Sequence, residues 1–457
     1  MARQRIAVIG GVASGPAAAA QAHRADPEAD VVLFEQGPHI SYGACEMPYF
    51  VAGEIERAET LVMLSPEQFE KTRGGKVKVG HRVIGLDPAR NRLTVENLDS
   101  GGVSTHRFDK FILALGARPK MPDIDEMDAV NVFAMRTLED AVGIKAYLAD
   151  YDVKHVVVLG GGYVGVEMAE AIRARQIRVT ILEPGPGLLH TYLDSDLRPL
   201  VDAVVQRHGV IVRHERAIAL EHHPGGTVVS TDRGERIGCQ MVLVTMGTVP
   251  NTELATQARI RSGLTGALAV DDQMRTNLPN VWACGDCVEV ERIIDHKKIY
   301  LPLAPAAFRT ARVAGQNAGR RGRGIPARFP GVTGASAVKV FELEVATVGL
   351  KLDEATAAGF DAFATIVRHW SRVSFYPGAR PLHVRLIAER RRGRLLGAEL
   401  VGEEGAALRA DVLVPLIREG ATVHALRDLD LIYTPPFAPA LDPLIVAAAK
   451  AVKWVKA

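Results

Sequence analysis

Two stretches of the chain repeat the same order of apolar and polar positions. Residues 5–10, RIAVIG, form a short β-branched run that meets a glycine turn and then an alanine-rich segment. Residues 155–160, HVVVLG, do the same before GGYVG and VEMAEAIRA. A second apolar run follows each stretch and ends in an acid, Glu35 in the first case and Glu183 in the second. The pattern predicts two units of strand, glycine turn, helix and strand, the arrangement that binds dinucleotides.

The second glycine turn fits the dinucleotide-binding pattern completely. Its glycines are Gly160, Gly162 and Gly165. Glu183 follows at the spacing of about 20 residues that such sites show. In this type of turn the first glycine lets the chain reverse, the second leaves room for a pyrophosphate, and the third lets the helix pack on the strand. The phosphates then face the N-terminus of the helix.

The first glycine turn departs from the pattern at one position. Gly10 and Gly15 match it, but Val12 occupies the middle position, with Gly11 beside it. A lone glycine turn would be weak evidence, because such turns also simply end strands. Two copies in one chain, each followed by an acid, favour two nucleotide sites.

The remaining patterns indicate how the rest of the chain is organised. Residues 237–251 and 276–290 are apolar runs that each end in a glycine-containing turn. Beyond residue 330, runs such as SAVKVFELEVATVGL and LLGAELVGE predict an antiparallel sheet. The Arg/Gly/Pro segment 320–331 is typical of a linker into this region. Residues 442–457 predict a terminal helix that docks on the fold rather than a membrane anchor.

The composition argues against several classes of function. The chain has 457 residues, enough for about three domains. Its net charge is +2, and the run RRGRG is short enough to be a solvated loop, so nothing favours nucleic acid. No apolar stretch approaches the ~20 residues of a membrane helix, and the N-terminus enters a strand without a signal-type apolar core. Four cysteines without an export signal do not make a disulfide framework, so we expect a cytoplasmic protein.

The four cysteines invite separate interpretations. Cys45 stands alone in SYGACEMPY, and a lone cysteine is most often a small buried residue. Cys284 and Cys287 form a CxxC pair, but a zinc site needs a second pair of ligands and the sequence offers none. Cys239 precedes an apolar run, which favours a place in the core. We therefore expect no metal site.

Seven short motifs follow one another between residues 10 and 286: GGVASG, VLFE, SYGAC, ALGARP, GGGYVGVE, MGTVPN and ACGD. In this order the sequence resembles the flavoprotein pyridine nucleotide-disulfide oxidoreductases. It is most similar to their single-cysteine branch, which includes coenzyme A-disulfide reductases and NADH-dependent persulfide and polysulfide reductases. The resemblance implies an α/β fold with two Rossmann-like dinucleotide-binding domains and a C-terminal α+β dimerisation domain with an antiparallel sheet. It divides the chain into a FAD-binding domain at 1–115 and 245–325, an NAD(P)H-binding domain at 116–244 and a dimerisation domain at 326–457.

The resemblance also implies which cofactors bind. FAD occupies the first unit, with Glu35 at the adenine-side ribose and Asp286 at the ribitol, and a nicotinamide nucleotide occupies the second. Cofactor contacts are expected from Gly10, Gly11, Val12, Gly15, Glu35, Gly116, Gly160, Gly162, Gly165, Glu167, Glu183, Gly247, Gly285 and Asp286. The carboxylate of Glu183 can accept hydrogen bonds from both ribose hydroxyls of NADH and would repel the 2′-phosphate of NADPH. The residues PGPGLL that follow supply no Arg or Lys, so NADH is the preferred donor over NADPH.

In this context Cys45 is predicted to be the redox nucleophile. Two-cysteine relatives carry the second thiol five residues after the first, where this chain has Phe50. A single thiolate can store electrons only through a bond to an outside sulfur or oxidant. The dipole of a helix that starts near Cys45 favours the thiolate, whereas the neighbouring Glu46 opposes it. By the resemblance, Tyr433 and Tyr376 approach this sulfur from the other subunit of a homodimer, where a phenol can protonate a leaving thiolate.

The expected substrate is a low-molecular-weight disulfide or persulfide, such as CoA disulfide, CoA persulfide or polysulfide. By the resemblance, a bound CoA group would contact Gln21, Arg24, Ser41 and Lys71. Polar residues that are common in CoA-disulfide reductases are replaced here by Ala44, Phe308 and Leu441. These replacements favour a broader choice of sulfur substrate.

Two other functions stay open at this point. A ferredoxin-type or oxygen-reducing NADH oxidase would leave Cys45 optional, but oxidases of this family carry a His where the first glycine turn has Ala13. A flavin-binding sensor without turnover would not need the complete second dinucleotide site. The sequence therefore predicts an FAD-dependent NAD(P)H oxidoreductase that acts on a sulfur group.

Overall fold

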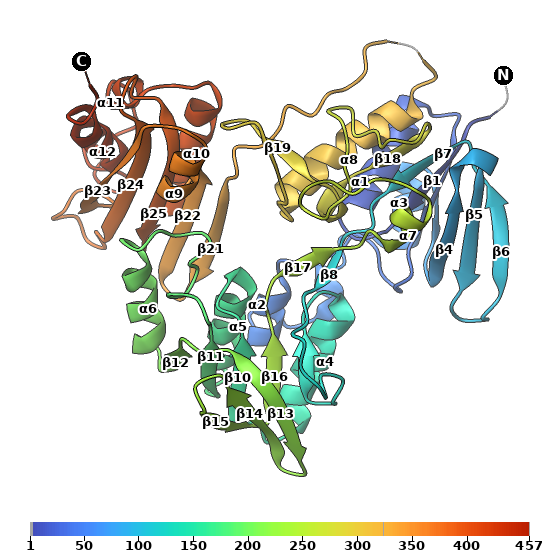
Figure 1. Cartoon of the computed structure of the whole chain (residues 1–457), viewed down its shortest axis with the longest axis horizontal. Helices are drawn as coiled ribbons and strands as arrows, with labels where there is room; N and C mark the ends of the chain where they lie inside the picture. The colour runs from blue at the N-terminus through green and yellow to red at the C-terminus, as the bar shows by residue number, and fades with distance from the viewer. Residues whose placement is uncertain (1–2, 323, 457) are drawn as a thin grey trace.

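The strands of the chain gather in three groups, which Figure 1 shows at the upper right, at the bottom and at the upper left. The computed structural model describes residues 3–322 and 324–456. Four residues lie outside this description. They are residue 323, which falls within the predicted linker, and residues 1–2 and 457, which are the ends of the first and last predicted domains. None of the helices in the described ranges is both long enough and apolar enough to cross a bilayer.

The first group is built on a sheet of five parallel strands in the order β18-β7-β1-β2-β3. Their bounds are Arg5–Ile9 (β1), Asp30–Phe34 (β2), Lys76–Lys78 (β3), Lys110–Leu113 (β7) and Val281–Ala283 (β18). Strands β1, β2 and β7 are nearly continuous buried apolar runs, as expected for a parallel sheet covered on both faces. Because β18 comes from a late segment, two distant parts of the chain complete this sheet.

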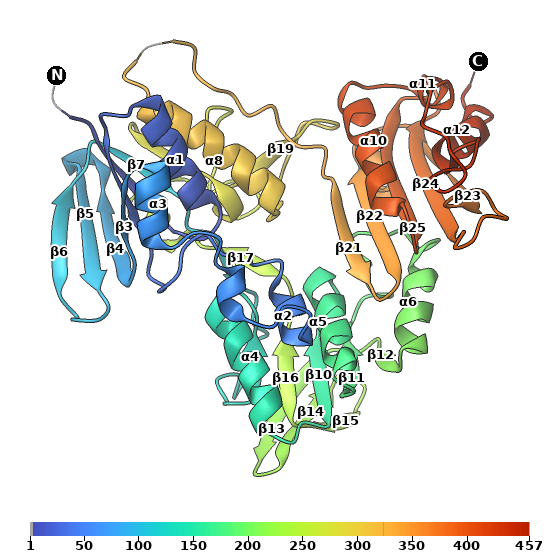
Figure 2. The ribbon, with the colours of Figure 1, turned by 180° about the vertical axis from the view of Figure 1, so that it is seen from behind.

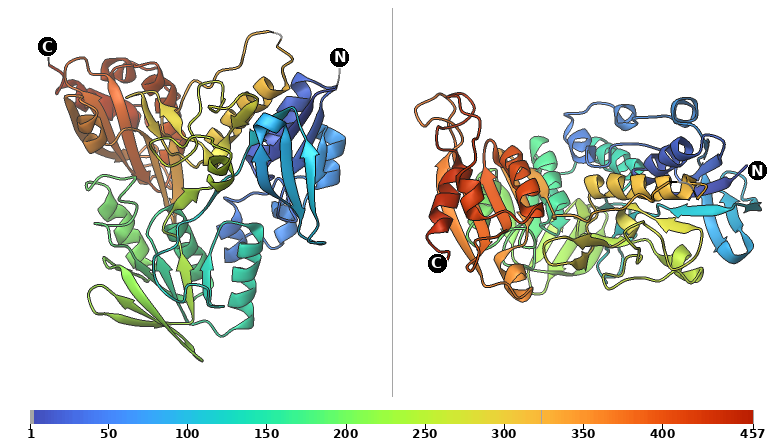
Figure 3. Two further views of the ribbon diagram at one scale, coloured as in Figure 1. Left: turned by 45° about the vertical axis from the view of Figure 1, so that its right-hand side comes forward. Right: turned by 90° about the horizontal axis from the view of Figure 1, so that it is seen from above.

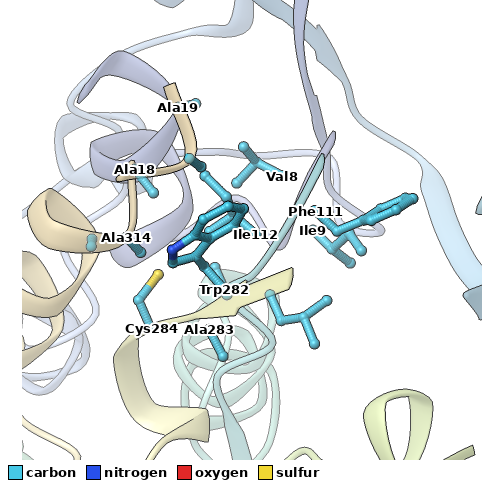
Figure 4. Close-up of a cluster of buried hydrophobic side chains, with 14 of the residues drawn as sticks. Val8, Ile9, Ala18, Ala19, Phe111, Ile112, Trp282, Ala283, Cys284 and Ala314 are labelled. Carbon is cyan, nitrogen blue, oxygen red and sulfur yellow. The ribbon is translucent and has the colours of Figure 1, made fainter. Parts of the chain in front are cut away.

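Helices α1 (Ser14–Ala25) and α8 (Ala304–Gly319) pack against each other beside this sheet, as the view from above in Figure 3 shows. A Cβ atom on Gly315 would collide with the carbonyl oxygen of Ala18, and one on Gly319 with that of Ala22. Small side chains therefore allow the two helices to approach closely. Figure 4 shows Cys284 within the same core, between this helix pair and the sheet, beside Trp282.

The second group repeats the same plan. Its five parallel strands have the order β12-β11-β10-β16-β9. Their bounds are Val132–Ala134 (β9), His155–Leu159 (β10), Arg178–Leu182 (β11), Val210–Arg213 (β12) and Met241–Val244 (β16). Helices α4 (Leu138–Asp150), α5 (Tyr163–Ala174) and α6 (Arg198–Arg207) accompany this sheet. The prediction of two Rossmann-like units is confirmed.

Short antiparallel sheets complete the two groups. In the first, they are β4 (His81–Asp87), β5 (Arg92–Asn97) and β6 (Val103–Arg107), with β19 (Val290–Arg292) and β20 (Lys297–Ile299). In the second, they are β13 (Ala217–His223), β14 (Gly226–Thr231) and β15 (Arg236–Cys239). The two groups are joined where β8 (Ala117–Pro119) pairs with β17 (Thr248–Pro250). The shorter helices are α2 (Met47–Ala52), α3 (Pro66–Arg73) and α7 (Glu253–Gln257), and one-turn 3₁₀ segments span Ala58–Leu61, Pro88–Arg90 and Gly285–Cys287.

The third group is an antiparallel sheet of five strands, which confirms the prediction for this part of the chain. Its order is β21-β22-β25-β24-β23, with bounds Ser336–Val340 (β21), Leu343–Gly349 (β22), Ala362–Trp370 (β23), Pro381–Glu389 (β24) and Leu395–Gly402 (β25). Helices α9 (Leu352–Ala357), α10 (Ala406–Arg418), α11 (Val423–Arg427) and α12 (Pro443–Val452) belong to it. Helix α12 buries Leu444, Ala447 and Ala448, so the terminal helix is docked on the fold, as its sequence predicts.

Candidate active site

The first glycine of each turn has no room for a side chain. Gly10 and Gly160 each have φ of +107°, a conformation that favours glycine. A Cβ atom on Gly10 would collide with the carbonyl oxygen of Ala114, and one on Gly160 would lie 2.7 Å from that of Thr245. The two turns are therefore pressed in the same way against the strand end beside them.

The middle position distinguishes the two turns. Gly162 is the residue before α5, and a Cβ atom placed on it would meet no atom within 4 Å. Its φ of −79° suits any residue, so glycine is not needed there for backbone reasons. The open space lies at the N-terminus of a helix, where a pyrophosphate binds in this type of unit. In the first turn, the side chain of Val12 stands at the matching position.

The two acids bind their glycine turns in the same way. Glu35 accepts a hydrogen bond of 2.5 Å from the amide of Gly11, and Glu183 accepts one of 2.8 Å from the amide of Gly161. Each acid also accepts a 2.7 Å hydrogen bond from the amide two residues further along the chain. Burial raises the pKa of Glu35, while amide hydrogen bonds, that of Gly37 first, lower it. Both carboxylates thus stand at the end of the second strand, beside the turn.

A cavity of about 1010 Å³ opens in front of the second glycine turn. It is lined by Gly160, Gly161, Gly162, Glu183, Thr245 and Gly247 and by the segment 189–192. This volume lies at the upper end of the range that ligand pockets span. Lys120 and Arg216 also line it, although no motif in the sequence marks either residue as part of a site.

Cys45 lies in the loop between the first acid and α2. The loop is tied to the first turn because the amide of Ser41, at φ +50°, donates a 3.0 Å hydrogen bond to the carbonyl of Gly11. Cys45 is exposed, two residues before α2, which packs on α5. The other three cysteines of the chain are buried.

The electrostatic environment of Cys45 differs from the expected one. Desolvation by the surrounding chain is the main cause that raises the pKa of the thiol, although the residue itself reaches solvent. The charges of Glu46, Glu167 and Asp286 raise this pKa further, and Arg136 lowers it. The expected support from a helix dipole does not set the net direction: the pKa is raised, first by desolvation and then by three carboxylates, and α2 has only six residues.

Asp286 is positioned by a residue that the sequence analysis missed. Arg136, which precedes α4, donates a 2.8 Å hydrogen bond to Asp286, and the guanidinium is close to Gly116 as well. Gly285, at φ +79°, has no room for a side chain because Ser14 lies against it. The structure thus brings Gly116, Gly285 and Asp286 together near the start of α1, in the electrostatic surroundings of Cys45.

Glu167 lies on α5 and faces the same region. Burial raises its pKa to about 7, with a further contribution from the charge of Glu170, while Lys339 lowers it. On α2, desolvation raises the pKa of Tyr49, and the charge of Glu167 raises it further. The carboxyl group therefore belongs to the surroundings of Cys45 as well as to the helix that begins at the second turn.

The residues predicted to contact CoA fall into two places. Gln21 and Arg24 are on α1, where Arg24 donates a 3.5 Å hydrogen bond to the side-chain oxygen of Gln21. The exposed Lys71 is on α3, and Gly74 at the end of α3 lies against His23 of α1. Figure 2 shows α3 beside α1. Ser41 lies apart from them, at the first glycine turn. Ala44 packs against the second core cluster, while Phe308 on α8 and Leu441 are exposed.

Tyr376 and Tyr433 belong to loops of the third group. Tyr433 is 52% exposed, and Tyr376 is half-buried under the guanidinium of Arg372, 5.9 Å from its ring centroid. Within the described residues, neither tyrosine is joined to Cys45 by a hydrogen bond or ring contact. Large exposed apolar side chains lie near both tyrosines along the chain: Phe375 precedes Tyr376, Ile432 precedes Tyr433, and Phe437 and Leu441 follow Tyr433. A single chain therefore does not bring these two tyrosines to the thiol.

In the described part of the chain, no group of three or more His, Cys, Asp or Glu side chains is arranged to hold a metal ion. The paired cysteines at 284 and 287 are fully buried, and desolvation raises the pKa of Cys287 to about 11. Its thiol donates to the carbonyl oxygens of Cys284 and Leu113. These two thiols pack in the core beside the first site.

Two family patterns match the chain. The pattern of the pyridine nucleotide-disulphide oxidoreductases matches residues 4–316, and that of the dimerisation domain of the same family matches residues 335–445. Together they span most of the three groups of strands.

Individual relatives match over nearly their whole length. The chain is 33% identical over 446 residues to the NAD(P)H coenzyme A polysulfide/persulfide reductase of Pyrococcus horikoshii, with 98% of each chain covered. It is 30% identical over 449 residues to the coenzyme A disulfide reductase of Staphylococcus aureus, covering 98% of this chain and 99% of that one. Among solved structures, the NAD-dependent persulfide reductase from A. fulgidus superposes with a TM-score of 0.94 at 32% identity, covering 98% of this chain and 83% of that one.

Proposed function

Because the chain belongs to the pyridine nucleotide-disulphide oxidoreductase family, we propose that it is an FAD-dependent NAD(P)H oxidoreductase that reduces a low-molecular-weight disulfide or persulfide. The candidate substrates are CoA disulfide, CoA persulfide and polysulfide, in line with the names of the relatives. The observation that carries the proposal is the exposed thiol of Cys45 near Asp286, in a chain whose other three cysteines are buried. The free thiols suit a reducing cytoplasm.

The glycine turns and their acids support two bound dinucleotides. FAD would be held by Gly10, Gly11, Val12, Gly15, Glu35, Gly116, Gly285 and Asp286, and the nicotinamide nucleotide by Gly160, Gly162, Gly165, Glu167, Glu183 and Gly247. When bound, FAD supplies the two-electron relay between nicotinamide and sulfur. The narrow glycine cradles and the open space at Gly162 are the features of the chain that fit these groups.

The protein's own part in the chemistry centres on one sulfur atom. The Cys45 thiolate attacks one sulfur of a disulfide R–S–S–R′, a Cys45–S–S–R bond forms, and R′S⁻ leaves. Two electrons, which come from NADH, then cleave the mixed disulfide and restore the Cys45 thiolate, and R–S⁻ takes up a proton. With a persulfide, the departing sulfur is hydrosulfide instead of a second thiol.

A proton donor for the leaving sulfur would come from a second subunit. Tyr433 or Tyr376 would approach Cys45 across a homodimer, and the exposed apolar side chains around them support a surface that is covered by another copy. The matched dimerisation-domain pattern supports the same arrangement. Light scattering on the active enzyme tests this proposal, and an active monomer would contradict it.

The side chains on α1 and α3 support a site for the phosphate and adenine groups of CoA. Gln21, Arg24 and Lys71 stand on adjacent helices, while Ser41 lies closer to the thiol along the chain. The exposed apolar side chains of Phe308 and Leu441 support weak recognition of CoA itself and a broader range of sulfur substrates. The ratio of kcat/KM for CoA persulfide to that for inorganic polysulfide measures this recognition.

Anaerobic titration with NADH tests the central proposal. A working Cys45 takes up electrons beyond those that FAD alone requires, so the wild type consumes more NADH per flavin than the Cys45→Ser variant. The buried Cys239→Ala variant is the matched control and keeps the wild-type stoichiometry. Equal consumption by wild type and Cys45→Ser would contradict a redox role for this thiol.

Steady-state rates separate the proposal from an oxygen-reducing NADH oxidase. We expect turnover with CoA disulfide, CoA persulfide or polysulfide to exceed turnover with oxygen. The absence of a proton-donating side chain at Ala13, which precedes α1, supports this order. Oxygen as the fastest acceptor, with full activity in Cys45→Ser, would favour the oxidase.

A further inference from the structure

A buried ion cluster joins the C-terminal sheet to the segment that lines the dinucleotide cavity. Its centre is Arg385 on β24, whose side chain is only 4% exposed. Arg385 bonds to Asp194, to Asp196 at 3.0 Å and to Glu399 at 3.0 Å. The first two carboxylates belong to the loop between β11 and α6, whereas Glu399 lies directly opposite Arg385 on β25.

The cluster holds the backbone of this loop as well as its side chains. Glu399 accepts a 3.0 Å hydrogen bond from the amide of Asp194, and Asp194 accepts one of 3.3 Å from the amide of Leu352. Lys351 donates to the carbonyl oxygen of His190 at 3.4 Å. The C-terminal region therefore forms hydrogen bonds with this loop at several points. Figure 1 shows α6, which follows the loop, beside the hairpin end of β21 and β22.

The other side of the same loop forms the wall of the cavity. Leu189, at φ +55°, donates its amide to the carbonyl of Gly161 at 2.9 Å, and the Tyr192 ring stacks on Tyr163 with centroids 3.9 Å apart. Leu189, His190, Thr191 and Tyr192 all line the cavity. Only one residue separates Tyr192 from Asp194, so a shift of the ion cluster would move the cavity wall directly.

We propose that Arg385 is a positioning residue for the nicotinamide nucleotide, because it fixes segment 189–196 against the second glycine turn. The inference rests on the proposed binding of NADH in this cavity. Arg385 does not line the cavity itself. Its effect passes through Asp194 and the backbone. The C-terminal region orders the cavity wall before NADH binds, so the free-energy cost of ordering this wall on binding is smaller. Arginine suits this role because its planar fork reaches three carboxylates at once.

A second buried arginine offers a matched control. Arg292 on β19 bonds to Asp295 at 2.9 Å and to Glu354 on α9 at 2.9 Å, and its side chain is 9% exposed. It too joins a nucleotide-binding region to the C-terminal region, and none of these residues lines the cavity. Glu354 accepts the amide of Lys351, so this cluster reaches segment 189–196 through one further residue, whereas Arg385 bonds to the segment directly. A lysine in its place removes the fork and keeps the charge, as it does at position 385.

The experiment measures the dissociation constant and KM for NADH, together with kcat, FAD content and Tm, in Arg385→Lys and Arg292→Lys. We expect KM for NADH to rise about tenfold in Arg385→Lys, with kcat within about twofold of wild type, because a buried charged hydrogen-bond network is weakened. Arg292→Lys lowers Tm to a similar degree and leaves KM for NADH at the wild-type value. Asp194→Asn repeats the rise in KM with a smaller change in the core, and Asp196→Asn gives a lesser rise because Asp196 is 54% exposed.

Each other outcome decides between the two proposals. An unchanged KM in Arg385→Lys and Asp194→Asn, in an enzyme that binds NADH normally, overturns the inference and leaves the proposed function standing. An equal rise in Arg292→Lys also overturns it, because the effect would then be general loosening. A wild type that does not bind NADH overturns the proposed function instead.

Discussion

The two dinucleotide units share one framework and differ in the loop that follows the acid. In both, the acid accepts a hydrogen bond from the amide of the residue after the first glycine, which is Gly11 or Gly161. The loop donates an amide back to the carbonyl of the same residue, from Ser41 in the first unit and from Leu189 in the second. Both donor residues have positive φ. The strand orders β3-β2-β1-β7-β18 and β12-β11-β10-β16-β9 match as well.

Beyond these shared bonds the loops diverge in what they contact. Counted from Ser41 and Leu189, the exposed Cys45 of the first loop corresponds to Leu193 of the second, which is buried. The next residue is Glu46 in the first loop and Asp194, bound to Arg385, in the second. The first loop therefore presents an exposed thiol in the electrostatic surroundings of Asp286, and the second loop is packed against the C-terminal sheet. A common strand-and-turn frame thus carries an exposed thiol in one unit and an anchor to the C-terminal sheet at the same place in the other.

The largest expected effect follows from removing the thiol that only the first loop carries. Cys45→Ser should lower the rate of disulfide or persulfide reduction about a thousandfold or more, because the one exposed thiol among the four cysteines is lost. Bound FAD and its reduction by NADH should persist. Stopped-flow spectra and steady-state rates measure both, with Leu193→Val as the variant at the corresponding position of the second loop. A near-wild-type rate of disulfide or persulfide reduction in Cys45→Ser would contradict the proposed mechanism.

The two acids allow a sharper test of the comparison. Glu183→Ala should lower the preference for NADH over NADPH by roughly tenfold to a hundredfold, or about 1–3 kcal/mol, because a carboxylate no longer faces the 2′-phosphate. The expected wild-type ratio of kcat/KM for NADH over NADPH exceeds one. Glu35→Ala, the counterpart in the first unit, should reduce FAD content and leave this ratio unchanged. A wild-type ratio below one, or no drop in Glu183→Ala, would show that this carboxylate does not select the donor.

The middle positions of the two turns differ in side-chain size, with Val12 in the first turn and Gly162 in the second. Gly162→Val places a side chain in open space, so Tm should change little while KM for NADH rises about tenfold. Val12→Gly enlarges the first turn and should leave KM for NADH unaffected. Thermal unfolding and steady-state kinetics on the two variants measure these effects. A large loss of Tm in Gly162→Val would mean that the position serves folding rather than binding.

The smallest expected effect concerns pH. Since the pKa of Cys45 is raised, the thiolate is scarce at neutral pH and the rate of sulfur reduction should rise as pH increases toward that pKa. Glu46→Gln removes the nearest negative charge, lowers the pKa and shifts the profile to lower pH, with a gain of a few-fold at neutral pH. Glu54→Gln, beyond the other end of α2, is the control. An unchanged profile in Glu46→Gln would show that this carboxylate does not govern the thiol.

Local sequence predicted the parts of the site that depend on local contacts. The glycine turns, the acids Glu35 and Glu183 and the antiparallel C-terminal sheet follow from periodicity and from residues close together in the chain. Cys45 as an isolated thiol could be singled out because its neighbours form a motif. Its role still depends on the proposed chemistry.

Long-range pairs could not be predicted from one sequence. Arg136 reaches Asp286 across 150 residues, and Arg385 reaches Asp194 across 191. No spacing rule connects such positions, because the contacts arise only when separate sheets and loops are brought together. The net shift in the pKa of Cys45 could not be predicted for the same reason. Desolvation, its largest cause, comes from the folded surroundings, and Glu167 and Asp286 come from two other segments. The sequence shows only Glu46 beside the thiol.

The late position of β18 has a consequence for how the chain folds during synthesis. All five strands of the second sheet lie between residues 132 and 244, so they have left the ribosome before β18, at 281–283, is made. The first sheet begins earlier but lacks its edge strand beside β7 until then. We expect the inserted unit to fold first although it starts later, and the flavin site to mature last. Limited proteolysis of ribosome-bound chains of increasing length tests this order. Protection of β10 should appear at a shorter chain length than protection of β7, and the reverse order would refute it.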